Sequence, residues 1–451
     1  MHSRFFSAAR LLLLATLLFA PLAFGAVQPW AWGTMGLLAI LIFLLWSAGN
    51  LTHKSVVLTW SWLFVPAALL FVLAVIQLAA HFTVDPASTR EAILKLAICL
   101  LLFFLTVQLY GHASRDAWHR LGLFVLLFAS ALALFGILQC FSSERMIYWQ
   151  VKSPNDDFGP YVDRDHYAGL MEMLIPVAAT YALSLKGGIS RPVLATFGVL
   201  IAVVSLLLTG CRGGFLALLV EFVLFAVIAA TLRIERKRFA LVLTAIAMVA
   251  AATGLWLSVA PDEIPARLAS IVRFRDPNVN PDRPEVSADT LRIFHDHLGV
   301  GVGLGAFDAI YPQYQSFSSE YVWDHAHDDY AELLAETGLP GALLAASGLL
   351  IFLYGAFLAR LKYRTGDTQS WIHLGAALAC CGLLVHSFFD FNLHIPANAA
   401  WFSVCAGLAT IRGTASRTRL RARTEITDHA RDNEEEYHPA LESVRGRRRH
   451  S

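Results

Sequence analysis

Hydrophobic residues occupy most of the chain in long runs that short polar segments separate. Most runs extend for about 20 residues, the length that an α-helix needs to cross the hydrocarbon core of a bilayer. The pattern predicts an all-α polytopic membrane protein with about 12 transmembrane helices. The runs cover residues 5–25, 30–49, 57–80, 91–110, 121–141, 166–185, 192–210, 213–232, 239–259, 338–359, 370–389 and 396–411.

The first of these runs has two interpretations. It follows Arg4 and ends at Ala23-Phe24-Gly25-Ala26, so it is either a retained helix or a cleavable signal peptide. The residues that follow it face outward in both cases. The orientation of the later helices is therefore the same.

Composition supports the membrane assignment and divides the chain. Hydrophobic residues make up 57% of the 451 residues and charged residues only 15%, against about 25% charged in soluble proteins, which excludes a soluble globular enzyme. Residues 260–337 and 413–451 together hold half of the charges. In residues 260–337, 14 acidic side chains outnumber 5 basic ones. We expect helices 1–9 in residues 1–259, one large, partly helical extracytoplasmic loop at 260–337, helices 10–12 in 338–412, and a disordered cytoplasmic tail at 413–451.

Lysine and arginine in the short loops predict the orientation. Cytoplasmic loops are enriched in these residues, and an N-terminus in the cytoplasm gathers the basic loops on one side. Both termini are then cytoplasmic, and the acidic loop 260–337 lies outside. The basic residues assigned to the cytoplasm are Lys54, Arg115, Arg120, Lys186, Arg191, Arg233, Arg236, Lys237, Arg238, Arg360, Lys362 and Arg364.

Four segments place unusual polar residues on the predicted outer side. They are the turn at Asp163 to Tyr167, the turn at Cys211 to Gly214, the acidic loop, and the last outer turn from His386 to Asn398. The candidate functional residues within them are Arg164, His166, Arg212, Arg283, His325, His327, Asp390 and His394.

Arg212 lies in a tight turn between two runs, with almost no polar loop around it. A charge at that depth is costly, so such a residue usually pairs or lines a cavity. Arg212 is either an interfacial arginine that reaches the headgroups or a ligand for phosphate or pyrophosphate. Gly213 and Gly214 would allow a ligand to approach the next helix N-terminus, where anions are favoured.

His327 precedes a short helix that we predict from Asp328 to Thr337, with Gly338 and Pro340 ending it. Histidine suits proton transfer near neutral pH, and Asp328 or Asp329 would orient the ring or only begin the helix.

The pair His325-x-His327 also suggests a metal site. No second well-spaced ligand set accompanies it, so we expect neither a metal nor a cofactor. The six cysteines show no paired spacing that predicts a disulfide or zinc site. Gly301-Val-Gly303-Leu-Gly305 lacks the βαβ context of a dinucleotide site and predicts a tight turn.

From about residue 155 to 410 the sequence resembles the O-antigen ligase and polymerase family of bacterial envelope enzymes. The resemblance rests on an Arg-x3-Leu element at Arg212 and Leu216 and a His-x10-Gly element at His327 and Gly338. Four flanking segments also look like family signatures. These are Tyr161-Val-Asp-Arg-Asp-His-Tyr-Ala-Gly169, Gly301-Val-Gly-Leu-Gly-Ala-Phe307, His325-Ala-His-Asp-Asp-Tyr330 and Asp390-Phe-Asn-Leu-His-Ile-Pro396.

The resemblance implies a glycosyltransferase that moves a glycan from undecaprenyl pyrophosphate to an acceptor hydroxyl outside the bacterial inner membrane. The acceptor is the lipid A core in ligases and another carrier-linked repeat in polymerases. It further implies an inverting, metal-independent displacement, with His327, Arg212 and Arg283 catalytic. We expect Arg164, His325, Asp390 and His394 to bind substrate. A lipid-linked glycan flippase is the alternative from another class.

Overall fold

A computed structural model describes residues 2–53, 58–144, 146–152, 157–185, 190–231, 283–319, 322–358 and 366–411. Helices form almost all of it, together with one small antiparallel pair of strands, β1 (Met146–Ile147) and β2 (Val151–Lys152). The expected run at 239–259, the loop residues 260–282 and the tail at 413–451 lie outside the described residues, as do most of the basic residues that predicted the orientation.

The described part of residues 2–208 contains seven longer helices, five before the strands and two after them. Their bounds are α1 (His2–Leu22), α2 (Pro29–His53), α3 (Phe64–Ala79), α4 (Pro86–Gly111) and α5 (Arg115–Ser142), then α6 (Arg164–Ser184) and α7 (Ser190–Leu208). A short 3-10 helix, η1 (Phe24–Ala26), joins α1 to α2.

The described segments from residue 212 onward are also helical. They are α8 (Arg212–Thr231), α11 (Arg283–Asp296), α12 (Phe307–Ile310), η2 (Tyr311–Gln313), α13 (Asp329–Leu353), η3 (Tyr354–Leu358), α14 (Thr368–His386), η4 (Asn392–His394) and α15 (Pro396–Thr410).

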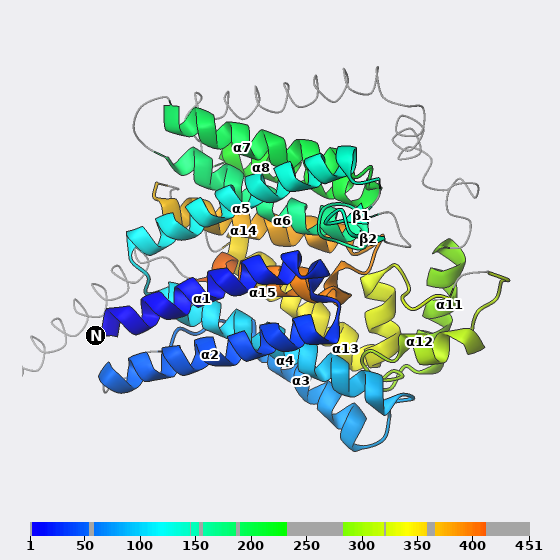
Figure 1. Cartoon of the computed structure of the whole chain (residues 1–451). Coiled ribbons are helices and arrows are strands. Elements are labelled where there is room, and N and C mark those ends of the chain that lie inside the picture. Colours follow the sequence, from blue (N-terminus) through cyan, green and yellow to red (C-terminus); the bar gives the residue numbers. More distant parts are fainter. Residues whose placement is uncertain are drawn as a thin grey trace, which may run out of the picture. The chain divides into compact units, whose positions relative to one another are not determined.

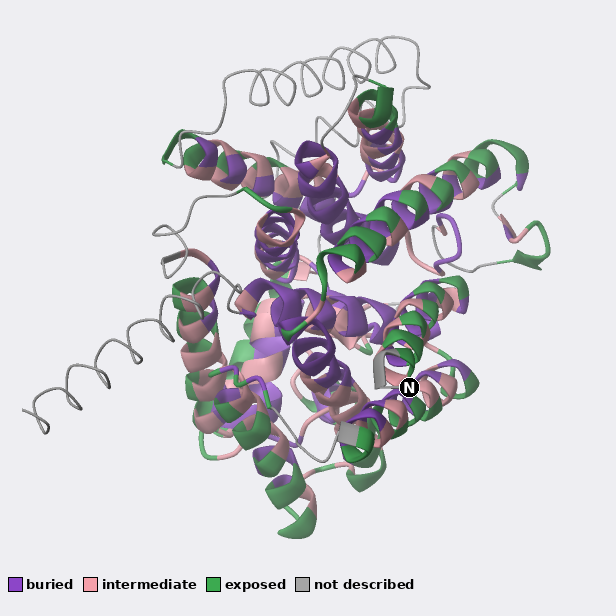
Figure 2. Cartoon of the chain, turned by 90° about the vertical axis from the view of Figure 1, so that its left-hand side faces the viewer, coloured by how far each residue is buried: buried purple, intermediate pink, exposed green. Residues whose placement is uncertain are grey.

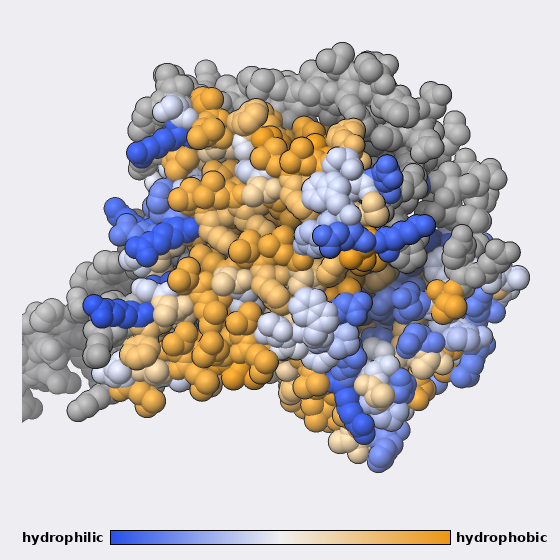
Figure 3. All heavy atoms as spheres, viewed as in Figure 1, coloured by the Kyte–Doolittle hydropathy of each residue, from blue (hydrophilic) through white to orange (hydrophobic). Residues whose placement is uncertain are grey.

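Every expected hydrophobic run within the described residues contains a helix. Eight of the described helices are long and apolar enough to cross a membrane, and α3 is a shorter apolar helix. The chain is therefore an all-α, multi-pass membrane protein. Figure 3 shows the corresponding apolar band, with hydrophilic residues at both ends of the helices.

Helix α6 lies at the centre of the fold and packs against α5, α7, α8, α14 and α15 (Figure 1). Almost all of its side chains are buried, whereas outer helices bury one face and expose the other (Figure 2). Close approach of α6 to α14 requires Gly375, because a Cβ there would lie 2.2 Å from the Thr180 hydroxyl oxygen. A buried, closely packed α6 gives its first turn a fixed position.

The segment from α11 to the start of α13 lies beyond one end of the longer helices (Figure 1). Gln77 at the end of α3 fastens it there: its amide donates to the Val300 and Glu336 carbonyls at 2.5 and 2.7 Å, and its carbonyl accepts from the Leu304 N–H. The predicted turn of three glycines is confirmed, since Gly301, Gly303 and Gly305 all have positive φ.

Candidate active site

Side chains from four distant segments meet at the end of the helices that carries α11. They come from the start of α6, the start of α8, the segment between α11 and α13, and the turn between α14 and α15. The contacts that join them include His166 with Asp390, Arg283 with Asp165, and His327 with Asp390. The structure thus brings together the residues that the sequence placed on one face.

His327 and Asp390 form the most direct of these contacts. The His327 Nδ1 lies 3.0 Å from Asp390 Oδ1, and no hydrogen bond to a described residue engages Nε2. His327 has a φ of +51°, in the left-handed region where histidine is tolerated better than most residues. This turn, one residue before the α13 cap, directs the ring toward Asp390 rather than along the helix.

Asp390 is almost fully buried, and burial opposes its charged form. The imidazoles of His166 and His327 and the guanidinium of Arg283 outweigh burial and hold the pKa of Asp390 well below its ordinary value. Phe391 packs beside it, with ring centroids 4.6 Å from His166 and 4.8 Å from His327. The His327 ring is therefore fixed on two sides.

Three arginines lie near this pair. Arg283, the first residue of α11, donates to the Phe389 carbonyl at 2.9 Å and lies 3.9 Å from Asp165. Arg212 is within electrostatic range of Arg164, Asp165 and Arg283. Among the described residues nothing forms a hydrogen bond or ion pair with Arg212, so its guanidinium has donors left for a ligand. Three guanidinium groups thus gather beside the carboxylates of Asp165 and Asp390, and guanidinium suits phosphate binding because it offers forked N–H donors.

Gly213 and Gly214 serve helix packing, and the expectation that they open the backbone to a ligand is wrong. A Cβ at Gly213 would lie 2.3 Å from the His386 ring, and one at Gly214 would lie 2.9 Å from Ala168. Both glycines let α8 approach α14 and α6 closely. The Cys211 sulfur accepts the Gly214 N–H at 3.3 Å and thus caps α8.

A buried polar pair, His386 and Glu172, lies next to the residue that precedes Arg212. His386 lies with Nε2 3.5 Å from Cys211 Sγ and Nδ1 3.0 Å from Glu172 Oε2, and both His386 and Glu172 are fully buried. This chain of contacts links α14, α6 and the residue before Arg212. We infer that it holds the start of α8 in place.

No hydrogen bond or ion pair among the described residues joins the Asp328 or Asp329 carboxylate to the His327 ring. Asp328 caps α13 by accepting the Tyr330 and Ala331 N–H groups, which is the second of the two roles that the sequence left open. Asp329 accepts from the Ser387 hydroxyl and the Leu393 N–H and lies 2.9 Å from His394. The partner of His327 is Asp390, which the sequence had assigned to substrate binding.

His325 and His394, the other predicted substrate ligands, lie around Glu332. The His325 Nδ1 is 2.7 Å from Glu332 Oε1, and the His394 Nε2 is 3.3 Å from the same oxygen. His325 also stacks on Phe391, with ring centroids 4.2 Å apart. His394 therefore contacts carboxylates through both ring nitrogens.

The predicted break at Gly338 is confirmed, because α13 consists of two helical parts that meet at a kink there. Gly338 has φ +61° and ψ −160°, a conformation almost restricted to glycine, and the helix resumes after it. A Cβ at Gly338 would lie 2.7 Å from the Gly301 nitrogen. The glycine of the His-x10-Gly element therefore lets the 298–301 turn dock against α13, eleven residues from His327.

Sequence reasoning missed Glu172, Glu332 and the orienting role of Asp329. A signal was present, because a carboxylate inside an apolar run is costly without a partner. Asp329, Glu332 and Glu336 also recur at spacings of three and four residues, which places them on one helix face. Their histidine partners come from other segments, and only the fold identifies them.

Comparison with known families agrees with this geometry. Residues 197–346 match the family model described as O-Antigen ligase. The match begins in α7, includes Arg212, Arg283 and His327, and ends within α13. No curated protein matches the chain. The chain therefore contains a segment that matches the O-antigen ligase family, within the region whose motifs resemble that family.

Proposed function

We propose that the protein is an O-antigen ligase-type glycosyltransferase. It transfers a glycan from undecaprenyl pyrophosphate to an acceptor hydroxyl on the outer face of the bacterial inner membrane. The observation that carries this proposal is the His327–Asp390 pair beside three arginines, one of which forms no hydrogen bond or ion pair with a described residue. A hydroxyl nucleophile needs a base, and a departing diphosphate needs cations.

In the proposed reaction the acceptor oxygen attacks the anomeric carbon while the bond from that carbon to the diphosphate oxygen breaks. His327 Nε2 takes the acceptor proton, and Asp390 on Nδ1 fixes the ring and stabilises the imidazolium. The leaving diphosphate receives the bond's electron pair, and Arg212 and Arg283 neutralise its charge. A single displacement inverts the anomeric centre and requires no metal at the reacting atoms.

Arg164 is the proposed contact for the sugar or the second phosphate. It lies in the first turn of α6, with Nε 3.8 Å from Asp165, which also faces Arg283. Asp165 thus lies between two arginines and orients both. In this proposal the buried helix α6 fixes the position of Asp165, which lies in its first turn.

The polymerase is the second candidate, because it joins the same donor to a different hydroxyl. A deletion strain distinguishes the two. Ligase predicts long glycan that stays on the carrier lipid and is absent from lipid A core, whereas polymerase predicts single repeat units on the core. Complementation with Arg212→Ala should fail while membrane levels of the protein stay normal, and a normal glycan profile from this variant would refute the proposal. If the protein were a flippase, the deletion strain would instead keep the lipid-linked glycan on the cytoplasmic side of the membrane.

A further inference from the structure

The cluster of His325, Glu332 and His394 has the composition of a transition-metal site. Their ligand atoms all lie within 4.8 Å of one another, although the residues come from a loop, from α13 and from η4. Two imidazoles and one carboxylate are a donor set that Zn²⁺ binds with three protein ligands and an open fourth position. Nothing in the proposed transfer reaction uses this cluster.

The carboxylate of Glu332 is held in the orientation that such a site requires. Its Oε2 accepts the Ala326 N–H at 2.8 Å, which leaves Oε1 facing the two imidazoles. The side chain is buried, with 1% of its surface exposed. One carboxylate oxygen is therefore anchored, and the other points to the centre of the cluster.

The imidazole of His394 is oriented in the way that metal-bound histidines usually are. Its Nδ1 lies 2.9 Å from Asp329 Oδ1, and its Nε2 is directed at the cluster. Asp329 is itself fixed by the Ser387 hydroxyl and the Leu393 N–H. A carboxylate on the outer nitrogen sets the tautomer that leaves the inner nitrogen free to bind a cation.

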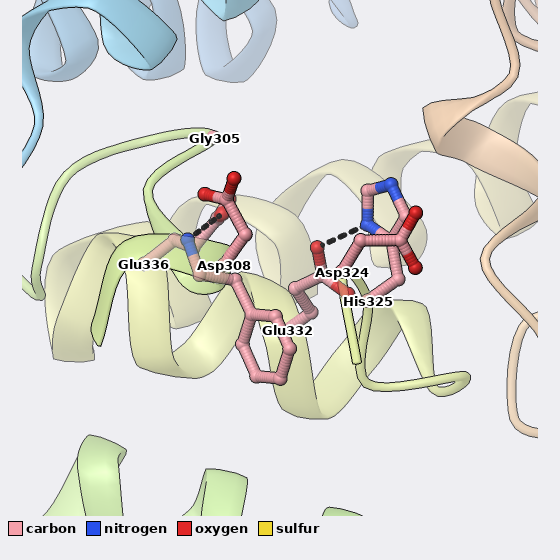
Figure 4. Close-up of a pocket in the computed structure, with 7 residues that line it drawn as sticks. Gly305, Asp308, Asp324, His325, Glu332 and Glu336 are labelled. Carbon is pink, nitrogen blue, oxygen red and sulfur yellow. Dashed lines mark hydrogen bonds and ion pairs between the residues drawn. The ribbon is translucent and has the colours of Figure 1, made fainter. Parts of the chain in front are cut away.

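Access to the cluster comes from a cavity of about 250 Å³ that His325 and Glu332 line. Figure 4 shows Asp308 and Asp324 in the same lining, together with the His325–Glu332 contact. Extra carboxylates around the opening favour the approach of a divalent cation. The cavity therefore reaches two of the three clustered residues, His325 and Glu332.

We propose that His325, Glu332 and His394 bind one first-row transition-metal cation, for which Zn²⁺ is the probe. The site goes beyond the proposed transfer reaction. It joins the loop that carries His327, two residues from His325, to the turn that carries Asp390, four residues before His394. The ion thus acts as a structural clamp that holds the catalytic pair in register, and it does not contact the reacting atoms.

The test uses the full-length protein in detergent, stripped with a chelator, desalted and titrated with Zn²⁺. We expect the wild type and the control to bind about one Zn²⁺ per chain more than the site variants below, and to show a rise in the thermal unfolding midpoint. Glu332→Gln and His394→Ala should lose that Zn²⁺ and the rise. Asp329→Asn should weaken the affinity about 10- to 100-fold. His295→Ala is the matched control, because His295 is an exposed histidine on α11.

Co²⁺ offers a readout that needs no variant to fold. In the stripped wild-type protein, a site of two imidazoles and a carboxylate should give visible absorption bands of four- or five-coordinate Co²⁺ that Zn²⁺ displaces. Absence of these bands, or no Zn²⁺ retained by the wild type, would overturn the proposal. So would folded Glu332→Gln and His394→Ala proteins that bind as much Zn²⁺ as the wild type.

Discussion

The imidazole of His327 and the carboxylate of Asp390 lie 3.0 Å apart, although 63 residues separate them in the sequence. The contact uses Nδ1 and leaves Nε2 without a hydrogen bond to any described residue. A buried carboxylate in this position orients the ring and stabilises the imidazolium that forms when the ring accepts a proton. The geometry makes Asp390 a positioning residue for His327.

Replacing Asp390 by asparagine tests that role. Asp390→Asn keeps the side-chain shape but removes the charge, so we expect the transfer rate to fall about 10²- to 10⁴-fold with little change in donor affinity. Steady-state rates and equilibrium binding with a lipid-linked donor check both effects. A wild-type rate in the Asp390→Asn enzyme would contradict the pairing.

Arg283 should be sensitive even to a change that preserves its charge. It donates to the Phe389 carbonyl while it faces Asp165, and lysine cannot reproduce this forked geometry. We expect Arg283→Lys to lose about 10- to 100-fold in rate. Arg292→Lys is the matched control, since Arg292 lies on the same helix and pairs with Asp289. An equal loss of transfer rate in the two variants would contradict a specific role for Arg283 in the site.

Gly338→Ala tests the kink in α13. The substitution places a Cβ against the Gly301 backbone at a φ of +61°, so we expect a loss of more than about 2 kcal/mol of folding stability. Gly348→Ala on the same helix is the control, because nothing lies closer than 3.8 Å to its added Cβ. That variant should be neutral or up to about 1 kcal/mol more stable. Thermal unfolding of the purified proteins in detergent distinguishes the two.

Asp163, the residue that caps α6, predicts a pH dependence of stability. Burial, followed by the charge of Asp165, raises the pKa of Asp163 to about 6. Because the folded protein then holds a proton that the unfolded chain has released, stability falls as the pH rises from about 4 to about 6, by up to roughly 3 kcal/mol.

Asp163→Asn keeps an N-cap acceptor but removes this ionisation. Its unfolding midpoint should therefore exceed that of the wild type at pH 7 and match it near pH 4. Asp116→Asn in the exposed first turn of α5 is the control and should follow the wild type across the range. A constant difference between Asp163→Asn and the wild type at all pH values would exclude this explanation.

Hydropathy alone predicted the helices, because a segment of about 20 apolar residues has few stable alternatives in a bilayer. It also predicted that Arg164, Arg212, Arg283 and His327 share one face, since orientation and loop order determine the side of each segment. The pairing of His327 with Asp390 could not be predicted from the sequence. Asp328 and Asp329 were nearer in the chain, and only the turn at His327 directs the ring away from them.

The packing role of Gly213 and Gly214 was beyond the sequence for a related reason. Glycine permits close approach of either a ligand or another helix, and the sequence does not say which partner arrives. The same holds for Glu332, whose two imidazole neighbours lie 7 residues before it and 62 residues after it. Spacing indicates a helix face, but the partners of that face depend on how the helices pack.

The central claim is that His327 removes the acceptor proton while the arginines hold the diphosphate. Single-turnover transfer by purified His327→Gln, with a lipid-diphosphate glycan and its acceptor, tests it most directly, with exposed His295→Gln as the control. The account predicts a rate at least about 10²-fold below wild type, with donor binding retained and the control unaffected. A His327→Gln enzyme that transfers glycan at the wild-type rate would contradict it.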